Sequence, residues 1–322
     1  MRGLTIIASA LVLAACSGGR GGREEAPDVV IDESWPDLPD SAVFGEPMAV
    51  DVDSHGHIFI LHRAGHDDTD GEGAETISEP TVFMLAANGK LLGKWGAGTF
   101  VEPHGLSVDG DDKVWITDTA RQQVFRFSHE GTEELVLGER GVAGEDQSHF
   151  GGPADIAFSQ GRVLVADGLS NNRIVVLDGD GNFLDQWVGL TRPRGIAADG
   201  GRVYVADSGS SAVQVFSPAG EREDEIGADR SGRPYAVKPI GSSYVLVMEG
   251  RDLQNRPGAI GRIYRPDGEL ERVFDAGVDH RTANSIGQDV AVGRDGSVYL
   301  VDSGTGRVVK FELAVAGVEE ED

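Results

Sequence analysis

The apolar residues of this chain recur in short alternating runs separated by turn residues, a pattern typical of β-strands rather than helices. Six runs share one form, and four of the six end in aspartate. They are Ile58 to His62, Val114 to Asp118, Val163 to Asp167, Val203 to Asp207, Val245 to Glu249 and Val298 to Asp302. A short apolar segment near a Pro or Gly turn precedes each run. The chain therefore repeats one β-unit along most of its length.

A hairpin pattern follows five of these runs. Its turn pairs are Asn88-Gly89, Glu130-Gly131, Asp180-Gly181, Ala219-Gly220 and Asp267-Gly268. Pairs of the Asn-Gly and Asp-Gly kind between alternating apolar residues are the strongest short-range signal for a hairpin. Each unit is therefore expected to contain four strands.

The spacing of the units predicts the architecture. The strand-terminal acids follow one another at 49 residues from Asp118 to Asp167, at 40 to Asp207 and at 42 to Glu249. Four strands at this period are typical of a propeller blade. We predict an all-β, six-bladed β-propeller over residues 28–317 with no second domain. A β-sandwich is the alternative, but it does not account for six copies of one unit.

The last unit, which ends at Val308 to Leu313, has no hairpin turn after it and is one strand short. The segment Asp28 to Ser34 contains three consecutive β-branched residues. Because an unpaired edge strand promotes aggregation, we expect this segment to pair with the last unit and close the ring.

Composition narrows the function. The chain has 54 acidic and 28 basic residues, a net charge of −26, which argues against nucleic acid and anionic membrane surfaces as partners. Its 46 glycines fit a fold with many tight turns and exclude a long coiled coil or helical bundle. Residues 318–322 form an acidic tail.

The single cysteine, Cys16, stands at the end of an N-terminal apolar run. The run is too short to span a bilayer, and Leu13-Ala-Ala-Cys16 resembles a bacterial lipobox. This resemblance implies a signal peptide at 1–15, acyl chains on Cys16 and a flexible tether at 16–27. An ordinary secretory signal with an incidental cysteine is the alternative. Both interpretations place the protein outside the cytoplasm, and the first anchors it by lipid in the cell envelope, facing the periplasm or the exterior.

The repeated unit, Pro-x-Gly followed by alternating apolar residues and Asp, resembles the NHL repeat. Several motifs in order between Trp35 and Leu313 are more specific. They are His62-Arg63, Pro103-His104-Gly105, Gln123 to Phe127, Asp146 to Phe150 and Ala166-Asp167-Gly168. With these, the chain resembles the catalytic core of the peptidyl-α-hydroxyglycine α-amidating lyases. That family removes glyoxylate from a C-terminal hydroxyglycine and leaves a peptide amide.

The resemblance implies a zinc centre of three histidines, each just after a turn that opens a repeat. His104 matches the first, but the second position is Arg194 and the third is Gln288. Because arginine is never deprotonated, it cannot coordinate zinc. We therefore expect the family's zinc centre to be absent.

The family's substrate-binding groups match only in part. Arg63 remains in the His-Arg motif, where it corresponds to a catalytic and ligand-binding arginine. The family's tyrosine base falls on Leu169 and its second arginine on Ser208. Leucine has no proton to exchange, so the family's usual chemistry is not expected here.

The resemblance also implies a structural calcium ion on the propeller axis. The carbonyls of Val50 and Leu106 and the carboxylate of Asp289 correspond to its ligands. Such hard oxygen ligands are those that calcium prefers. The alternative is that Asp289 only caps a turn.

Other chemical groups have plainer interpretations. His62 and His66 could join His104 in a different metal triad, although histidines at strand ends are usually solvated. His149 is expected to order a loop, and the four aspartates that end runs are expected to bond backbone groups in turns: Asp118, Asp167, Asp207 and Asp302. The insertion at 64–79 carries an acidic run: Asp67, Asp68, Asp70 and Glu72. This run could bind cations or a basic peptide, but charged runs in loops are usually only solvated.

Two functions follow. The first is a monomeric binding module that takes a small molecule, a peptide or a protein at the channel mouth. Arg63, His104 and Arg194 would there accept an anion such as a C-terminal carboxylate. The second is an active lyase or hydrolase with a rearranged metal site, for example His104 with carboxylates of the acidic loop. The sequence leaves open whether the protein is an enzyme.

Overall fold

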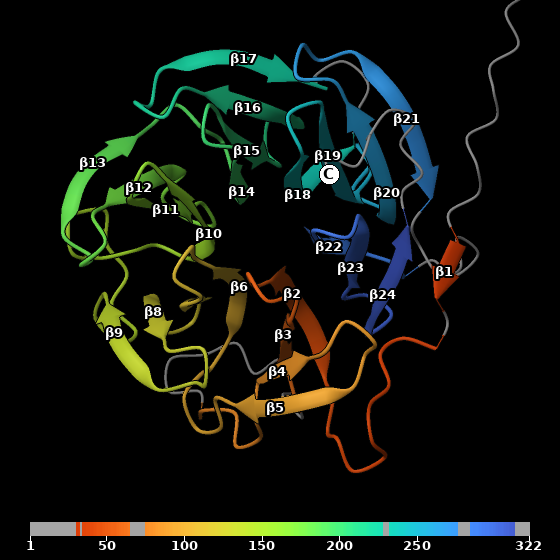
Figure 1. Cartoon of the computed structure of the whole chain (residues 1–322). Helices are drawn as coiled ribbons and strands as arrows, with labels where there is room; N and C mark the ends of the chain where they lie inside the picture. Colours follow the sequence, from red (N-terminus) through yellow and green to blue (C-terminus); the bar gives the residue numbers. More distant parts are fainter. Residues whose placement is uncertain (1–29, 33, 65–74, 228–231, 276–283, 313–322) are drawn as a thin grey trace, which may run out of the picture.

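The computed structural model describes residues 30–32, 34–64, 75–227, 232–275 and 284–312 and arranges them as a ring of six antiparallel sheets (Figure 1). Each sheet has four strands, and no helix occurs in these ranges. The predicted all-β, six-bladed propeller is therefore confirmed. In the same ranges there is also no helix of the length and apolarity needed to cross a membrane.

The first three blades follow the chain without interruption. Their strands are β2 (Glu46–Val52), β3 (Ile58–Arg63), β4 (Val82–Leu85) and β5 (Leu91–Trp95); β6 (Pro103–Val108), β7 (Val114–Asp118), β8 (Gln123–Phe127) and β9 (Glu133–Leu137); and β10 (Pro153–Ser159), β11 (Arg162–Asp167), β12 (Arg173–Leu177) and β13 (Phe183–Trp187). The fourth and fifth blades have the same order. Their strands are β14 (Pro193–Ala198), β15 (Val203–Asp207), β16 (Ala212–Phe216) and β17 (Arg222–Ile226); and β18 (Arg233–Ile240), β19 (Tyr244–Arg251), β20 (Pro257–Tyr264) and β21 (Leu270–Asp275).

The sixth blade joins the two ends of the chain. It contains β22 (Gly287–Val292), β23 (Ser297–Asp302), β24 (Arg307–Glu312) and, at its outer edge, β1 (Val30–Asp32). Strand β1 pairs antiparallel with β24, with Ile31 opposite Phe311 (Figure 1). The predicted closure of the ring by the N-terminal segment is thus confirmed, and it removes one exposed edge.

The strands differ in burial according to their place in the blade. The second strands, such as β7 and β15, are buried on both sides because neighbouring blades cover both of their faces. The outermost strands, such as β5, alternate between partly buried and exposed residues. This difference explains why the second strand of each blade gave the clearest apolar run in the sequence.

The innermost strands, β2, β6, β10, β14, β18 and β22, contact one another in this cyclic order around the axis. Glycine allows the closest of these approaches. A Cβ atom on Gly105 would lie 2.3 Å from the Ala154 carbonyl oxygen, and one on Gly195 would lie 2.5 Å from that of Tyr235. The Pro-x-Gly turn of the repeat is therefore a packing requirement at the axis.

The acids that end the second strands hold the turns that open the blades. Asp118 accepts hydrogen bonds from the Val101 and Glu102 amides, at 2.7 and 3.2 Å. Asp207 accepts one from the Arg192 amide at 2.5 Å, and Glu249 accepts one from the Gly232 amide at 2.7 Å. The predicted turn-fixing role of the aspartates is confirmed. Cys16, the tether at 16–27 and the tail at 318–322 lie outside the described residues.

Candidate functional site

The candidate site lies at the end of the propeller where the six innermost strands begin, which we call the site face. His104, Arg194 and Gln288 are each the second residue of an innermost strand, in β6, β14 and β22. These strands belong to alternate blades. Equivalent positions of alternate blades are arranged around the axis at the same level, so the fold brings the three side chains together.

Their polar atoms meet at one point. The Arg194 Nη2 group donates a hydrogen bond to His104 Nε2 at 3.4 Å and another to Gln288 Oε1 at 3.3 Å. The side-chain nitrogen of Gln288 also lies 3.4 Å from His104 Nε2. Arg194 and Gln288, the two positions at which the resemblance implies histidine, therefore both face His104.

The hydrogen bonds of His104 define which ring nitrogen carries its proton. Nδ1 lies 2.8 Å from the Ala154 carbonyl oxygen, which can only accept, so Nδ1 is the donor and Nε2 holds the lone pair. Burial lowers the pKa of His104 to about 3, and the positive charges of Arg194 and Arg63 contribute to the lowering. The ring is therefore neutral, and its lone pair points at the Arg194 guanidinium group.

This donor set does not fit a zinc ion. A catalytic zinc takes three ligands from His, Cys or carboxylate and keeps one open position. Here His104 offers one nitrogen, Arg194 offers only donors, and the guanidinium group already occupies the lone pair that would bind the metal.

Arg194 is a charged group that is stacked on an aromatic ring and has one donor with no partner in the described part of the chain. Its guanidinium carbon lies 3.8 Å above the centre of the Tyr235 ring, a cation–π contact. Burial lowers the pKa of Arg194 to about 10, and the nearby charges of Arg192, Arg251 and Arg63 add to the effect. Arg194 Nε is buried and has no hydrogen-bond partner among the described residues.

Arg63 lies at the end of β3, beside the start of β6. Its Nε donates a hydrogen bond to the Pro103 carbonyl at 3.1 Å, and its Nη1 lies 3.7 Å from a carboxylate oxygen of Glu46. The side chain is 12% exposed. It is therefore oriented by the residue that precedes His104.

Four arginines thus place positive charge at the site face of an acidic protein, and we call them the arginine cluster: Arg63, Arg192, Arg194 and Arg251. Arg63 and Arg194 were predicted from the sequence, whereas Arg192, Arg251 and the ring of Tyr235 were not. Arg192 directly precedes β14, Tyr235 lies near the start of β18, and Arg251 ends β19, two residues after Glu249. Their position in the repeat was a signal that could have indicated the site.

The positions of the family's remaining groups are chemically inert here. The Ser208 hydroxyl donates to the Arg192 carbonyl at 3.0 Å and is buried. Leu169 is half-buried, and its amide donates to the Gly152 carbonyl at 3.2 Å. Neither residue offers a base near His104.

The other histidines named from the sequence have separate environments. His62 is a core residue, packed against Phe44 and Phe83 with ring centres 4.8 and 4.4 Å away. Burial lowers its pKa to about 4. His149 lies 2.9 Å from Asp146 in an exposed loop, as a loop-ordering role requires. His66 and the acids of the run from Asp67 to Glu72 lie outside the described residues.

Further along the axis, three carboxylates and one ammonium group surround the channel. They are Asp51, Asp155, Asp289 and Lys238. Asp289 accepts the Val50 amide at 2.9 Å and the Val290 amide at 2.8 Å. A cavity of about 210 Å³ is lined by Asp51, Ser107 and Lys238, among others.

This donor set fits a calcium ion. Three carboxylates against one ammonium group leave an excess of negative charge and of hard oxygen ligands. Asp289 and the carbonyls of Val50 and Leu106 would hold the ion. The calcium ion stays a prediction. The Lys238 ammonium group already places one positive charge in the same channel.

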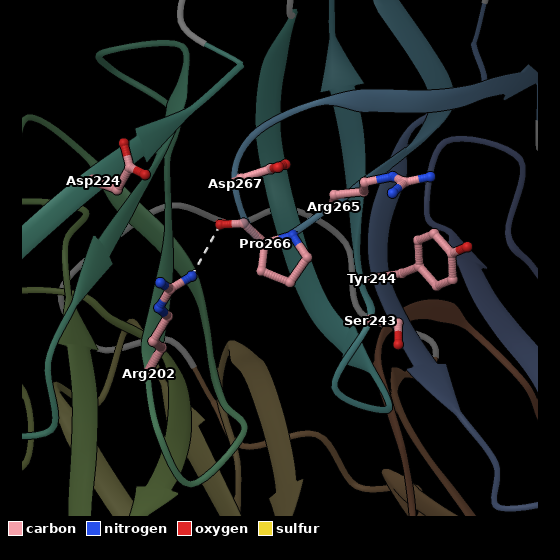
Figure 2. Close-up of a pocket in the computed structure, with 7 residues that line it drawn as sticks. All are labelled: Arg202, Asp224, Ser243, Tyr244, Arg265, Pro266 and Asp267. Atoms are coloured by element: carbon pink, nitrogen blue, oxygen red, sulfur yellow. Dashed lines mark hydrogen bonds between the residues drawn. The ribbon is translucent and has the colours of Figure 1, made fainter.

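A larger pocket of about 600 Å³ lies at the opposite end of the strands, between turns of the fourth and fifth blades (Figure 2). Arg202 donates across it to the Pro266 carbonyl at 2.9 Å. Arg265, also in its wall, forms an ion pair with Glu271. Both arginines of this pocket are therefore engaged by neighbouring acceptors.

Comparison with known proteins agrees with this architecture. The NHL-repeat family matches residues 100–127 and 190–216. A gluconolactonase from Xanthomonas campestris shares the fold, with 14% identity and a TM-score of 0.62 over 84% of this chain and 86% of that chain. The chain is therefore an NHL-repeat β-propeller.

Sequence relatives add a more specific similarity. A probable peptidyl-α-hydroxyglycine α-amidating lyase of Caenorhabditis elegans is 29% identical over 85% of this chain and 84% of its own length. Peptidyl-glycine α-amidating monooxygenase B of Xenopus laevis is 28% identical over 90% of this chain, which spans only 37% of that protein. The chain is a homologue of the peptidyl-α-hydroxyglycine α-amidating lyases, and the resemblance noted from its motifs is confirmed.

Proposed function

We propose that this protein is a lipid-anchored, extracytoplasmic binding module that takes a carboxylate-bearing ligand, such as a peptide C-terminus, at the site face. In this proposal the zinc-dependent chemistry of its relatives is lost. One observation carries the proposal: the Arg194 guanidinium group lies against His104 Nε2 at 3.4 Å, where a metal would have to bind.

The charge of the site supports an anionic ligand. Arg194 is partly desolvated, stacked on Tyr235 and surrounded by the other members of the arginine cluster. A guanidinium group in such a position binds a carboxylate through two parallel hydrogen bonds. The Arg194 Nε group has no partner among the described residues, and a carboxylate that also accepts from the adjacent Nη2 group would displace Nη2 from His104 or Gln288.

Calorimetry with N-acetylated pentapeptides of mixed sequence tests the proposal. Peptides with a free C-terminal carboxylate should bind, and the same peptides with a C-terminal amide should bind at least about 10-fold more weakly, since a charged hydrogen-bond partner contributes about 1.5–3 kcal/mol. An Arg194→Gln variant should lose this preference. Arg202→Gln, which changes a guanidinium group at the opposite end of the propeller, is the matched control. Equal affinity for both peptide forms in the unaltered protein would overturn the proposal.

An active lyase is the second candidate, and the names of the relatives favour it. Elemental analysis of the purified chain and an assay for glyoxylate release from a hydroxyglycyl peptide separate the two. The binding module predicts no glyoxylate and no zinc bound through His104. Glyoxylate release that disappears in a His104→Ala variant would establish the lyase instead.

A further inference from the structure

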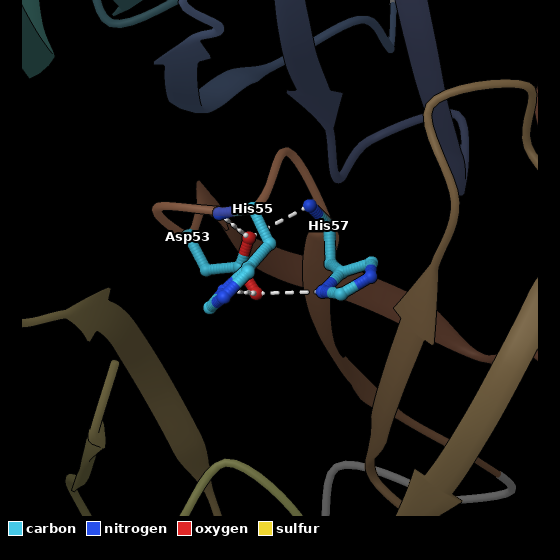
Figure 3. Close-up of side chains that lie close together, drawn as sticks. All are labelled: Asp53, His55 and His57. Atoms are coloured by element: carbon cyan, nitrogen blue, oxygen red, sulfur yellow. Dashed lines mark hydrogen bonds and ion pairs between the residues drawn. The ribbon is translucent and has the colours of Figure 1, made fainter. Parts of the chain in front are cut away.

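A cluster of histidines around one buried carboxylate lies at the end of the propeller opposite the site face. Asp53, His55 and His57 occupy the turn between β2 and β3 (Figure 3). His129 lies in the turn between β8 and β9 of the next blade. The ligand atoms of Asp53, His55 and His57 lie within 4.8 Å of one another. Three imidazole rings from two blades thus surround one aspartate.

Asp53 is fixed by its own turn. Its Oδ1 accepts hydrogen bonds from the amides of His55 and His57, both at 2.8 Å (Figure 3). Its side chain is fully buried, which alone raises the pKa of Asp53, but hydrogen bonds from His129 and His57 lower it below its usual value. The carboxylate is therefore charged and rigid, and its Oδ2 is directed at the imidazole rings.

Two ring nitrogens converge on this oxygen. His57 Nδ1 and His129 Nε2 each lie 2.8 Å from Asp53 Oδ2. The His129 ring is oriented by edge contact with Phe59, with ring centres 5.3 Å apart. His55 Nδ1 lies 4.0 Å from the same oxygen and 3.2 Å from Asp112 Oδ2.

These distances suit a tetrahedral metal. With metal–nitrogen and metal–oxygen bonds of about 2.0–2.2 Å, neighbouring ligand atoms stand roughly 3.3 Å apart. The observed separations of 2.8 and 4.0 Å bracket this value, so small rotations of exposed side chains would be sufficient. Imidazole and carboxylate together are ligands of zinc and similar divalent transition metals rather than of calcium or magnesium.

We propose that Asp53, His55, His57 and His129 form a structural binding site for zinc or a similar divalent transition metal that joins the first two blades. Four protein ligands close the coordination sphere, as in structural zinc sites. In this site His57 Nδ1 and His129 Nε2 would bind the metal as neutral imidazoles, each with its ring proton on the other nitrogen. The site is independent of His104, which lies at the other end of β6.

Calorimetric titration of the full chain with zinc chloride, after removal of any purification tag, tests this site. We expect one zinc ion per chain and a rise of the melting temperature on binding. A His57→Gln/His129→Gln variant keeps hydrogen-bond donors at both positions and should bind zinc at least about 10-fold more weakly. Cobalt(II) should give the visible absorption of a tetrahedral nitrogen–oxygen site, and this band should disappear in the same variant.

Two controls separate this site from the other histidines. His149→Gln alters another histidine–carboxylate pair and should leave zinc affinity unchanged. His104→Gln should also leave the zinc affinity unchanged. A loss of zinc binding in this variant would contradict the proposed function as well as this site. The metal site is wrong if the folded double variant, verified by circular dichroism, binds zinc as tightly as the unaltered chain, or if that chain binds none.

Discussion

At the scale of single residues, the metal-binding capacity of the site face depends on the two side chains beside His104. A neutral imidazole with its proton on Nδ1 has the lone pair that a metal requires, and the Ala154 carbonyl enforces this tautomer. The neighbouring residues are incompatible with a metal, since Arg194 presents a fixed positive charge and Gln288 an amide. Two side chains, and not the scaffold, therefore separate this site from a three-histidine centre.

Restoring those two side chains tests this view. In an Arg194→His/Gln288→His variant, three imidazoles would occupy equivalent positions of alternate blades and one cation would be removed. We expect the variant to bind one additional zinc ion per chain, measured by elemental analysis after dialysis against zinc. The Arg194→Ala/Gln288→Ala variant, which removes the charge without adding ligands, should bind no additional ion. Equal zinc content in the two variants would show that the scaffold itself has changed.

Much of this site was predictable from the sequence because the repeat fixes equivalent positions. The resemblance to the lyases, whose zinc ligands each follow an opening turn, singled out His104, Arg194 and Gln288 at equivalent positions of the repeat. Arg251 and Lys238 could not be placed in this way, since their proximity to the axis depends on which side chains of facing blades extend inward. The histidine cluster at Asp53 was missed because its members come from turns outside the repeated motif.

At the scale of elements, an acid at the end of the second strand stabilises the opening turn in five of the six blades. Asp167 is the clearest case: it accepts hydrogen bonds from the Gly151 amide, Asn171 and Arg173 at 2.6, 2.7 and 2.9 Å. The side chains of Asp167 and Arg173 are 0% and 4% exposed. Removal of this carboxylate would leave the Gly151 amide without its acceptor and the buried charge of Arg173 without its counter-ion, although the guanidinium group still donates to the carbonyls of Glu145, Asp146 and His149.

We therefore expect Asp167→Ala to lower the free energy of unfolding by about 3–5 kcal/mol, the usual cost of breaking a buried ion pair from one side. Denaturant unfolding followed by tryptophan fluorescence measures this change. Glu130→Ala, at a hairpin turn where the side chain is 79% exposed, should change stability by less than about 0.5 kcal/mol. A small effect of Asp167→Ala would mean that the turn is held by its backbone alone.

At the scale of the whole molecule, polar bonds around the axis join several of the innermost strands to their neighbours. Asp289 bonds the Val50 amide, Asp51 bonds the Val108 amide at 2.9 Å and Asp155 bonds the Ile196 amide at 2.8 Å. The carboxylates that make these bonds also repel one another across the channel. Burial raises the pKa of Asp155 and of Asp289. The charge of Asp51 raises the pKa of Asp155 further, and the charge of Asp155 raises that of Asp289 further.

Lys238 is the charge that makes this arrangement tolerable. Its Nζ lies 3.9 Å from Asp51 Oδ1, and the two side chains are 17% and 20% exposed. Burial alone would lower the pKa of Lys238, but Asp51, Asp289 and Asp155 raise it above its ordinary value. The ammonium group is therefore charged at every pH at which the carboxylates ionise, and it lowers the pKa of Asp155 and Asp289.

A Lys238→Met variant should accordingly lose stability in a pH-dependent way. The folded-state pKa values of Asp155 and Asp289 already lie above the ordinary carboxyl value near 4, and removal of the ammonium group raises them further. Ionised buried carboxylates destabilise the folded state, so the penalty is absent below that ordinary pKa and grows as the pH rises above it. At pH 8 the buried carboxylates lack their positive partner, so we expect the free energy of unfolding to fall by about 3–5 kcal/mol. At pH 5 we expect a clearly smaller fall. Urea unfolding at both pH values, with EGTA present to exclude calcium, measures the difference. An equal loss of stability at both pH values would show that Lys238 acts through packing and not through its charge. In a separate measurement, calcium added at pH 8 should restore part of the lost stability if the ion binds at Asp289.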